Sequence, residues 1–205
     1  MRSSELKPTK AIARKVLQVV DAGLTYGKGS PEPGKMFVEA AVCFAFGLPH
    51  SDNPPCVGNA VRSFKIRLND SRWPSDAARA KGMRKLAIAQ LGSDQIDQRK
   101  FADLVIVGTI NKVLPLAIER VISVSTKLSD ENKAKIKEAI KACEGVKTRE
   151  QGYEVAKAAK ELMYSVRAYA AADYRLKVLT LSAQIGLDAL IELKSPGTKW
   201  LDLCD

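Results

Sequence analysis

Residues 35–46 read Lys-Met-Phe-Val-Glu-Ala-Ala-Val-Cys-Phe-Ala-Phe and lie between Gly34 and Gly47. This stretch is apolar on almost every side of a helix, which is typical of a helix buried against several others. Gly47 supplies the residue type that commonly ends a helix. The sequence therefore predicts a central helix from Lys35 to Phe46, against which the rest of the chain packs.

The remainder of the chain carries the same helical signature. Apolar residues recur at spacings of three and four, whereas alternation of β-branched residues is scarce. We therefore predict an all-α fold, a compact multi-helix bundle. The further helices expected before residue 145 span 9–22, 57–69, 75–91 with Ser75 as N-cap, 97–123 with a kink or break at Pro115, and 129–143.

The C-terminal part of the chain is dominated by alanine. Helical periodicity continues from Thr148 to Lys194, which predicts a long Ala-rich helix or a helix pair with a bend near Asp173 to Leu176. The segment 195–204 follows a helix stop and contains three large apolar residues, so we expect it to fold back and dock. Composition changes near residue 125, and residues 126–205 are expected to pack on residues 1–125 within one domain.

Composition limits the classes of protein to consider. The chain has 205 residues, 46% of them hydrophobic, and a net charge of +10. Such a charge favours an anionic partner, either a phosphate-bearing ligand or an acidic protein. The N-terminus lacks an apolar stretch of signal-peptide length and no apolar run approaches about 20 residues, so we expect a cytoplasmic protein without a membrane segment. Its four cysteines should remain reduced there.

A basic stretch follows the central helix. From Arg62 to Lys85 there are eight basic and two acidic residues, which is six of the ten net charges. The ligand-binding candidates in this stretch are Arg62, Lys65, Trp73, Lys81, Arg84 and Lys85. Their cations would share helical faces, and Trp73 could stack on a base in the turn between the helices. The structural alternative is a solvated outer face with Trp73 filling the core.

The segment from Cys43 to Cys56 concentrates groups that bind metals or titrate near neutral pH. Cys43, His50, Asp52 and Cys56 are possible zinc ligands, although their spacing fits no standard finger. His50 with Cys56 or Asp52 is a possible catalytic pair, since Cys56 precedes a helix whose dipole would favour a thiolate. The structural alternative is that His50 and Asp52 bond to loop backbone and cap the next helix.

Several sequence blocks resemble a group of uncharacterised bacterial and phage-encoded proteins. The blocks are GKMFVEAAVC (34–43), GLPHSDNPPCV (47–57), FKIRLND (64–70), RAKGMRKLAIAQLGS (79–93) and LIELKSPG (190–197). No activity is attached to that group. The resemblance therefore implies a bacterial or phage setting and not a reaction.

Three functions remain open at this stage. The favoured one is a non-enzymatic binding protein without a cofactor, whose basic surface recognises a nucleotide signal or a nucleic acid. The second is an enzyme that uses the Cys43 to Cys56 segment. The third is an assembly protein that forms homo-oligomers through small residues of the Ala-rich helix, at positions 156, 159, 163, 166, 170 and 173–174.

Overall fold

The structure is a computed structural model that describes residues 6–124, 129–164 and 172–205, and within these ranges it is all-α, as predicted. No strand is present in the described ranges, and only an isolated bridge joins Gly29 and Met36. The α-helices are α1 (Lys10–Asp21), α2 (Val38–Ala45), α3 (Asn59–Asn69), α4 (Asp76–Ala89), α5 (Gln98–Gly108), α6 (Leu114–Val124), α7 (Asp130–Glu144), α8 (Arg149–Tyr164) and α9 (Ala172–Glu192). Shorter elements are the 3-10 helices η2 (Ser93–Gln95) and η4 (Pro196–Cys204) and the π-helical turn η3 (Thr109–Val113).

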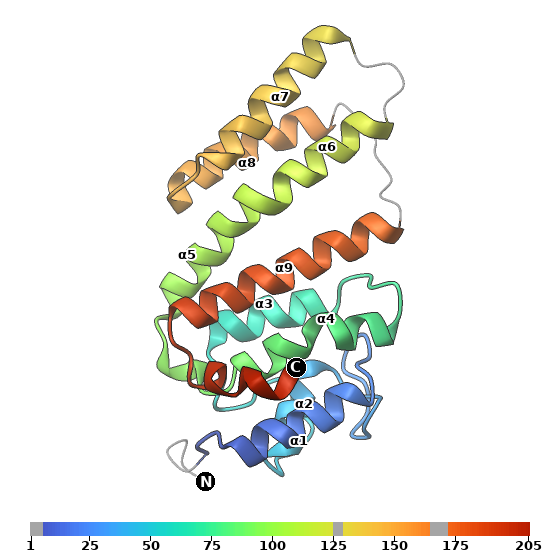
Figure 1. The fold of residues 1–205 in the computed structure, drawn as a ribbon, viewed down its shortest axis with the longest axis vertical. Coiled ribbons are helices and arrows are strands. Elements are labelled where there is room, and N and C mark those ends of the chain that lie inside the picture. Colours follow the sequence, from blue (N-terminus) through green and yellow to red (C-terminus); the bar gives the residue numbers. More distant parts are fainter. Residues whose placement is uncertain (1–5, 125–128, 165–171) are drawn as a thin grey trace.

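The helices form two groups joined by one long helix (Figure 1). Helices α1 to α4, α9 and η4 pack together in the lower part of the view. The rod formed by α5, η3 and α6 rises from this group; α7 packs on α6 and η3, and α8 packs along α5 and α6. Helix α2 lies within the lower group, as expected for the most apolar helix: seven of its eight residues are buried.

Each group has its own apolar core. The larger core combines residues of α1 to α5 with residues of α9 and η4, among them Leu187, Leu190 and Trp200. The smaller core contains Ile110, Ile118, Ile136, Cys143 and Val146. Each core therefore draws residues from both sides of position 125.

Polar side chains define several helix ends, as the sequence suggests. Ser75 Oγ accepts a hydrogen bond from the backbone N–H of Ala78, which confirms Ser75 as the N-cap of α4. Asp97 caps α5 in the same way, by accepting from two backbone N–H groups. After α4, Gly92 adopts a left-handed conformation with φ of 80°, which a glycine tolerates without strain.

Pro115 lies just after the π-helical turn in the long helix. Proline lacks an N–H group and its ring clashes with the carbonyl four residues earlier, so a wider turn accommodates it without breaking the helix. The rod continues through this turn in Figure 1. Within the turn, Asn111 donates a side-chain hydrogen bond of 2.9 Å to the carbonyl of Val146, which ties the rod to the end of α7.

One helix in the described ranges, Gln98–Arg120, is long and apolar enough to cross a membrane by length and composition alone. This differs from the expectation that no such segment exists, which relied on polar interruptions. Two of these interruptions have protein partners: Asp103 lies 3.6 Å from Arg149, and Asn111 bonds to Val146. Phe101, Ile110 and Ile118 are buried in the two cores.

The C-terminal part forms two helices and not one. Helix α8 packs on α7 and α9 packs on α4, which confirms the predicted helix pair. The bend expected near Asp173 to Leu176 does not lie there, because these residues belong to α9. The segment after α9 docks as predicted: Trp200 is buried, and Ser195 Oγ donates a 2.7 Å hydrogen bond to the carbonyl of Ala89. This docking places Cys204 and Asp205 beside α4.

Candidate anion-binding groove

Three basic residues of α4 lie on one side of the helix. Lys81, Arg84 and Lys85 are spaced by three and four residues, so they share a face. The opposite face carries Met83, which is buried in the larger core. Lys81 and Lys85 are exposed and Arg84 is partly buried, so these three cations lie outside the core.

This basic face borders a groove between α4 and α9. The groove has a volume of about 580 Å³. Its apolar lining residues are Ala78, Gly82, Leu86, Leu176, Ala183 and Leu187, and its polar ones are Lys81, Arg84, Lys85, Thr180, Gln184 and Cys204. No acidic side chain is among the described lining residues, although Asp21 and Asp205 pair with Arg84 and Lys85, so Lys81 supplies the unpaired positive charge of the groove.

The cations differ in how firmly they are held. Arg84 donates two hydrogen bonds to the Asp21 carboxylate, at 2.6 and 3.0 Å, and a third of 2.7 Å to the carbonyl of Cys204. The bonds that it donates to Asp21 raise the pKa of Arg84 above its usual value. Lys85 pairs with the Asp205 carboxylate at 3.1 Å, both side chains being half-exposed or more. Lys81 is exposed and makes no ion pair within the described ranges.

A second hollow of about 410 Å³ adjoins the same face of α4. Lys81 and Arg84 line it together with Asp21 and Asp76. Asp21 and Asp76 line this hollow themselves, whereas no carboxylate is among the described lining residues of the groove, so the hollow suits an anion less well. The groove between α4 and α9 is therefore the candidate site.

Lys65 does not belong to this surface, contrary to the sequence-based prediction. Its side chain has no exposed area, and its Nζ lies 3.3 Å from Oε1 of Glu39, which is equally buried. Neither Nζ nor the two carboxylate oxygens has a hydrogen-bond partner in the described chain. Burial lowers the pKa of Lys65 and raises that of Glu39, while the attraction between the two charges opposes both shifts.

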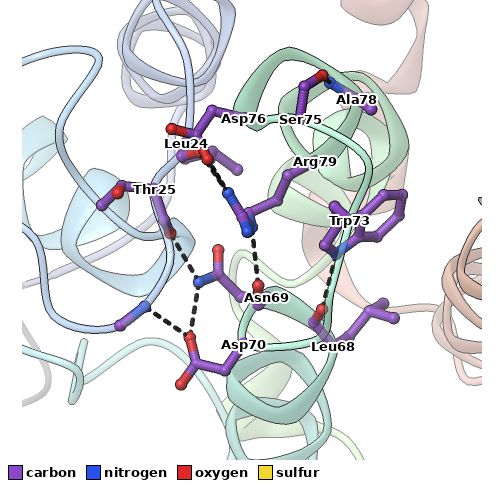
Figure 2. A network of polar contacts seen from close by, with 11 residues as sticks. Leu24, Thr25, Leu68, Asn69, Asp70, Trp73, Ser75, Asp76, Ala78 and Arg79 are labelled. Atoms are coloured by element: carbon purple, nitrogen blue, oxygen red, sulfur yellow. Dashed lines mark hydrogen bonds and ion pairs between the residues drawn. The ribbon is translucent and has the colours of Figure 1, made fainter. Parts of the chain in front are cut away.

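Trp73 is also buried, and the prediction that it stacks on a base is wrong. Its indole N–H donates a 2.8 Å hydrogen bond to the carbonyl of Leu68 (Figure 2). The ring lies against Gly82, where an added Cβ would come within 2.4 Å of it. Trp73 therefore fills the core beneath α4, which is the structural alternative.

Arg62 lies on α3, is half-buried, and donates a hydrogen bond to Asn53 Oδ1. It does not line the groove. The six predicted ligand-binding residues therefore do not form one patch: only Lys81, Arg84 and Lys85 come together.

Arg79, another member of the basic stretch, is the centre of a buried network (Figure 2). Its guanidinium donates to the carbonyls of Asn69 and Leu24, at 2.8 and 3.0 Å, and pairs with Asp76. Asn69 also donates to the carbonyl of Thr25. These bonds join the end of α3 and the start of α4 to the loop after α1, so the charged side chain of Arg79 stabilises the fold.

The Cys43 to Cys56 segment is only partly assembled into a site. His50 and Asp52 line a small pocket of about 240 Å³ with Phe37, Lys28 and Ser51. His50 Nε2 donates to the carbonyl of Lys28 at 2.7 Å, in agreement with the structural alternative of a bond to loop backbone.

The two cysteines of that segment do not line this pocket. Both thiols are buried, and burial raises the pKa of Cys43 to about 11 and that of Cys56 to about 12. The expected thiolate at Cys56 is therefore wrong, because the loss of solvent outweighs the helix dipole. Among the described residues no group of three or more His, Cys, Asp or Glu side chains could hold a metal ion, so Cys43, His50, Asp52 and Cys56 do not gather as ligands.

Neither the Glu39–Lys65 pair nor the carboxylates that pair with the cations of the groove were predicted from the sequence. A signal for the pair exists, since Lys65 follows Val61 by four residues and precedes Leu68 by three on the buried stripe of α3. The pairing of Arg84 with Asp21 and of Lys85 with Asp205 depends on contacts between distant segments, which leave no local signal. Of the small-residue seam proposed for self-association, positions 159, 163, 166, 170 and 173 lie outside the residues whose side chains are described.

Comparison of the chain with models of protein families, with curated proteins and with solved structures found no match in any of the three.

Proposed function

We propose that the protein is a non-enzymatic helical binding protein that recognises an anionic ligand in the groove between α4 and α9. The observation that carries this proposal is the lining of the groove, where Lys81, Arg84 and Lys85 stand beside an apolar floor without an acidic neighbour in the lining. Charge-assisted hydrogen bonds from such groups are about twice as strong as neutral ones. The groove thus combines attraction for an anion with a surface that shields the contact from water.

A small anion, such as a nucleotide, suits the groove better than a long nucleic acid. The volume of about 580 Å³ falls within the range typical of small-molecule sites. Binding of a nucleic acid without such a pocket relies on a longer basic track and on exposed aromatic rings. Trp73 is buried, and Lys65 and Arg79 are used inside the fold, so the basic stretch offers fewer exposed cations than its sequence suggests.

The three cations would contribute differently to binding. Lys81 can meet a ligand without breaking an ion pair inside the described chain. Lys85 would exchange its pair with Asp205, which is exposed and contributes little to stability. Arg84 would keep its ion pair with Asp21 and turn its remaining N–H groups to the ligand. Its main role is therefore to hold a positive charge at a fixed place.

The experiment compares Lys81→Glu with the wild type and with Arg67→Glu, a charge reversal at an exposed position of α3 outside the groove. Calorimetry with a cyclic dinucleotide is run beside filter binding of nucleic acid at two salt concentrations. We expect the nucleotide to bind, and Lys81→Glu to weaken it about tenfold or more because a charge-assisted contact is lost and a repulsive charge is added.

Arg67→Glu changes the net charge equally and should leave nucleotide affinity within about twofold, since exposed charges at a distance are screened. Equal loss in both variants would mean that only the overall charge matters, which contradicts the proposal. Absence of binding to either ligand would contradict it as well. Binding of the nucleic acid alone, with a steep dependence on salt, would replace the small-ligand proposal by a polymer-binding one.

A further inference from the structure

The floor of the groove is aliphatic along its length. Gly82 and Leu86 of α4 face Leu176, Ala183 and Leu187 of α9. The floor therefore offers methyl and methylene contacts and no aromatic ring.

The polar groups at the rim are poorly placed to identify a nucleobase. Among the described lining residues, the uncharged polar side chains of the two helices are Thr180 and Gln184, and the Gln184 amide already donates a 2.7 Å hydrogen bond to Asp188. A base requires hydrogen bonds to its edge or a stacking surface. The cations can hold the phosphates of a nucleotide, but the floor gives its base no identifying contact and suits an aliphatic chain better.

We infer that the ligand of the groove is a single-chain amphiphilic anion, with its carboxylate or phosphate on Lys81 and Lys85 and its aliphatic chain along the floor. This inference rests on the proposed function and narrows it to one chemical class. The head group gains charge-assisted hydrogen bonds, while the aliphatic chain of the ligand moves from water onto an apolar surface. The cations that would bind the head group lie on α4, whereas most of the large apolar side chains that would contact the aliphatic chain lie on α9.

Asp205 already occupies the place of the head group. Its carboxylate lies 3.1 Å from Nζ of Lys85, so an incoming anion must displace it. Because both partners are largely exposed, the pair is easily exchanged. An Asp205→Asn variant should therefore bind the amphiphile more tightly than the wild type does.

The test is a chain-length series measured by calorimetry on the whole chain below the aggregation concentration of each compound: hexanoate, octanoate and decanoate, with decanol and inorganic phosphate as controls. Each added methylene should raise affinity about fourfold, the equivalent of the transfer free energy of a buried methylene. Decanol lacks the charge and phosphate lacks the chain, so both should bind at least tenfold more weakly than decanoate.

Two variants locate the site. Thr180→Trp should fill the groove and remove the dependence on chain length, because Thr180 is exposed and lines it. Lys177→Trp, on the same helix but outside the lining, is the matched control and should behave as the wild type.

A second measurement uses the wild-type protein, so it remains informative if Thr180→Trp does not fold. Cys204 lines the groove and is the least buried of the four cysteines. Bound decanoate should slow its reaction with a thiol reagent several-fold, whereas decanol at the same concentration should not.

The outcomes separate this inference from the proposed function. If cyclic dinucleotide binds and the fatty acids show no dependence on chain length, the proposed anion binding is supported and the inferred amphiphilic ligand is wrong. If no anion binds, both the proposed function and this inference are wrong. If anionic vesicles bind while monomeric decanoate does not, the ligand is a membrane surface, and if only an acidic helical peptide binds, it is a partner protein; either result overturns the inference.

Discussion

Replacing Lys65 by methionine should strongly destabilise the protein. The substitution keeps the length of the side chain and removes the charge that faces Glu39 at 3.3 Å. Neither side chain has any exposed area, so in the variant the Glu39 carboxylate is left inside the core without a counter-charge. Breaking such a buried pair costs about 3–5 kcal/mol, a large part of the 5–15 kcal/mol typical of a whole domain.

The double variant Glu39→Leu, Lys65→Met separates the pair from its surroundings. It removes both charges and fills the space with apolar atoms, so it should recover most of the loss or exceed the wild type by about 1 kcal/mol or more. Urea unfolding followed by circular dichroism measures each free energy, and the exposed Lys81→Met is the control, expected to change it by less than about 0.5 kcal/mol.

The pH dependence of the single variant gives a further check. Without Lys65 the pKa of Glu39 rises further above its ordinary value of 4.5, because burial is no longer opposed. A group whose pKa is raised in the folded state stabilises the fold below its unfolded pKa, and this stability is lost as pH rises through the folded pKa. The deficit of Lys65→Met should therefore shrink toward pH 4.5. A loss below about 1 kcal/mol at neutral pH, or a deficit that grows on acidification, would refute the account of a buried pair.

Cys204 alone should react quickly with a thiol reagent in the folded protein, since the other three cysteines are buried, and full reaction should require unfolding. Burial raises the pKa of Cys56 from 9.0 to about 12, so the buried neutral thiol stabilises the fold below pH 9 and this stability is lost toward pH 12. The melting temperature should therefore fall less at alkaline pH in Cys56→Ala than in the wild type. Gly82→Ala should lower the melting temperature, as the new Cβ would come within 2.4 Å of the Trp73 ring; an unchanged temperature would contradict the packing of α4. Arg84→Glu should cost about 1–3 kcal/mol in urea unfolding, because it places a carboxylate against Asp21 and orphans a carbonyl, and a neutral effect would contradict these contacts.

The helices could largely be predicted from the sequence because their signals are local. Ser75 caps α4 and Asp97 caps α5 through bonds to residues two or three positions away, so the residue types alone mark these ends. The spacing of Val16, Val19 and Val20 likewise marks one side of α1, and all three are buried. Such features depend on no other part of the chain.

The candidate site depends on contacts that a local pattern does not contain. Counting charges treats every lysine as exposed, yet Lys65 lies on the buried stripe of α3, and only the presence of Glu39 on a neighbouring helix permits this. The groove itself arises because α9 crosses α4 about a hundred positions earlier in the chain. The sequence therefore indicated a basic region, while the fold decides which of its cations can meet a ligand.

The place where an anion binds on the folded protein can be located directly by NMR. Backbone amide signals of labelled protein are followed by NMR while inorganic pyrophosphate is added, and then again with decanoate. If the groove binds anions, shifts should concentrate in residues 78–86 of α4 and 176–187 of α9 for both anions, and Lys81→Glu should abolish them. Shifts centred on the His50 pocket, or spread evenly over exposed lysines and arginines, would contradict the claim that the groove between α4 and α9 binds anions.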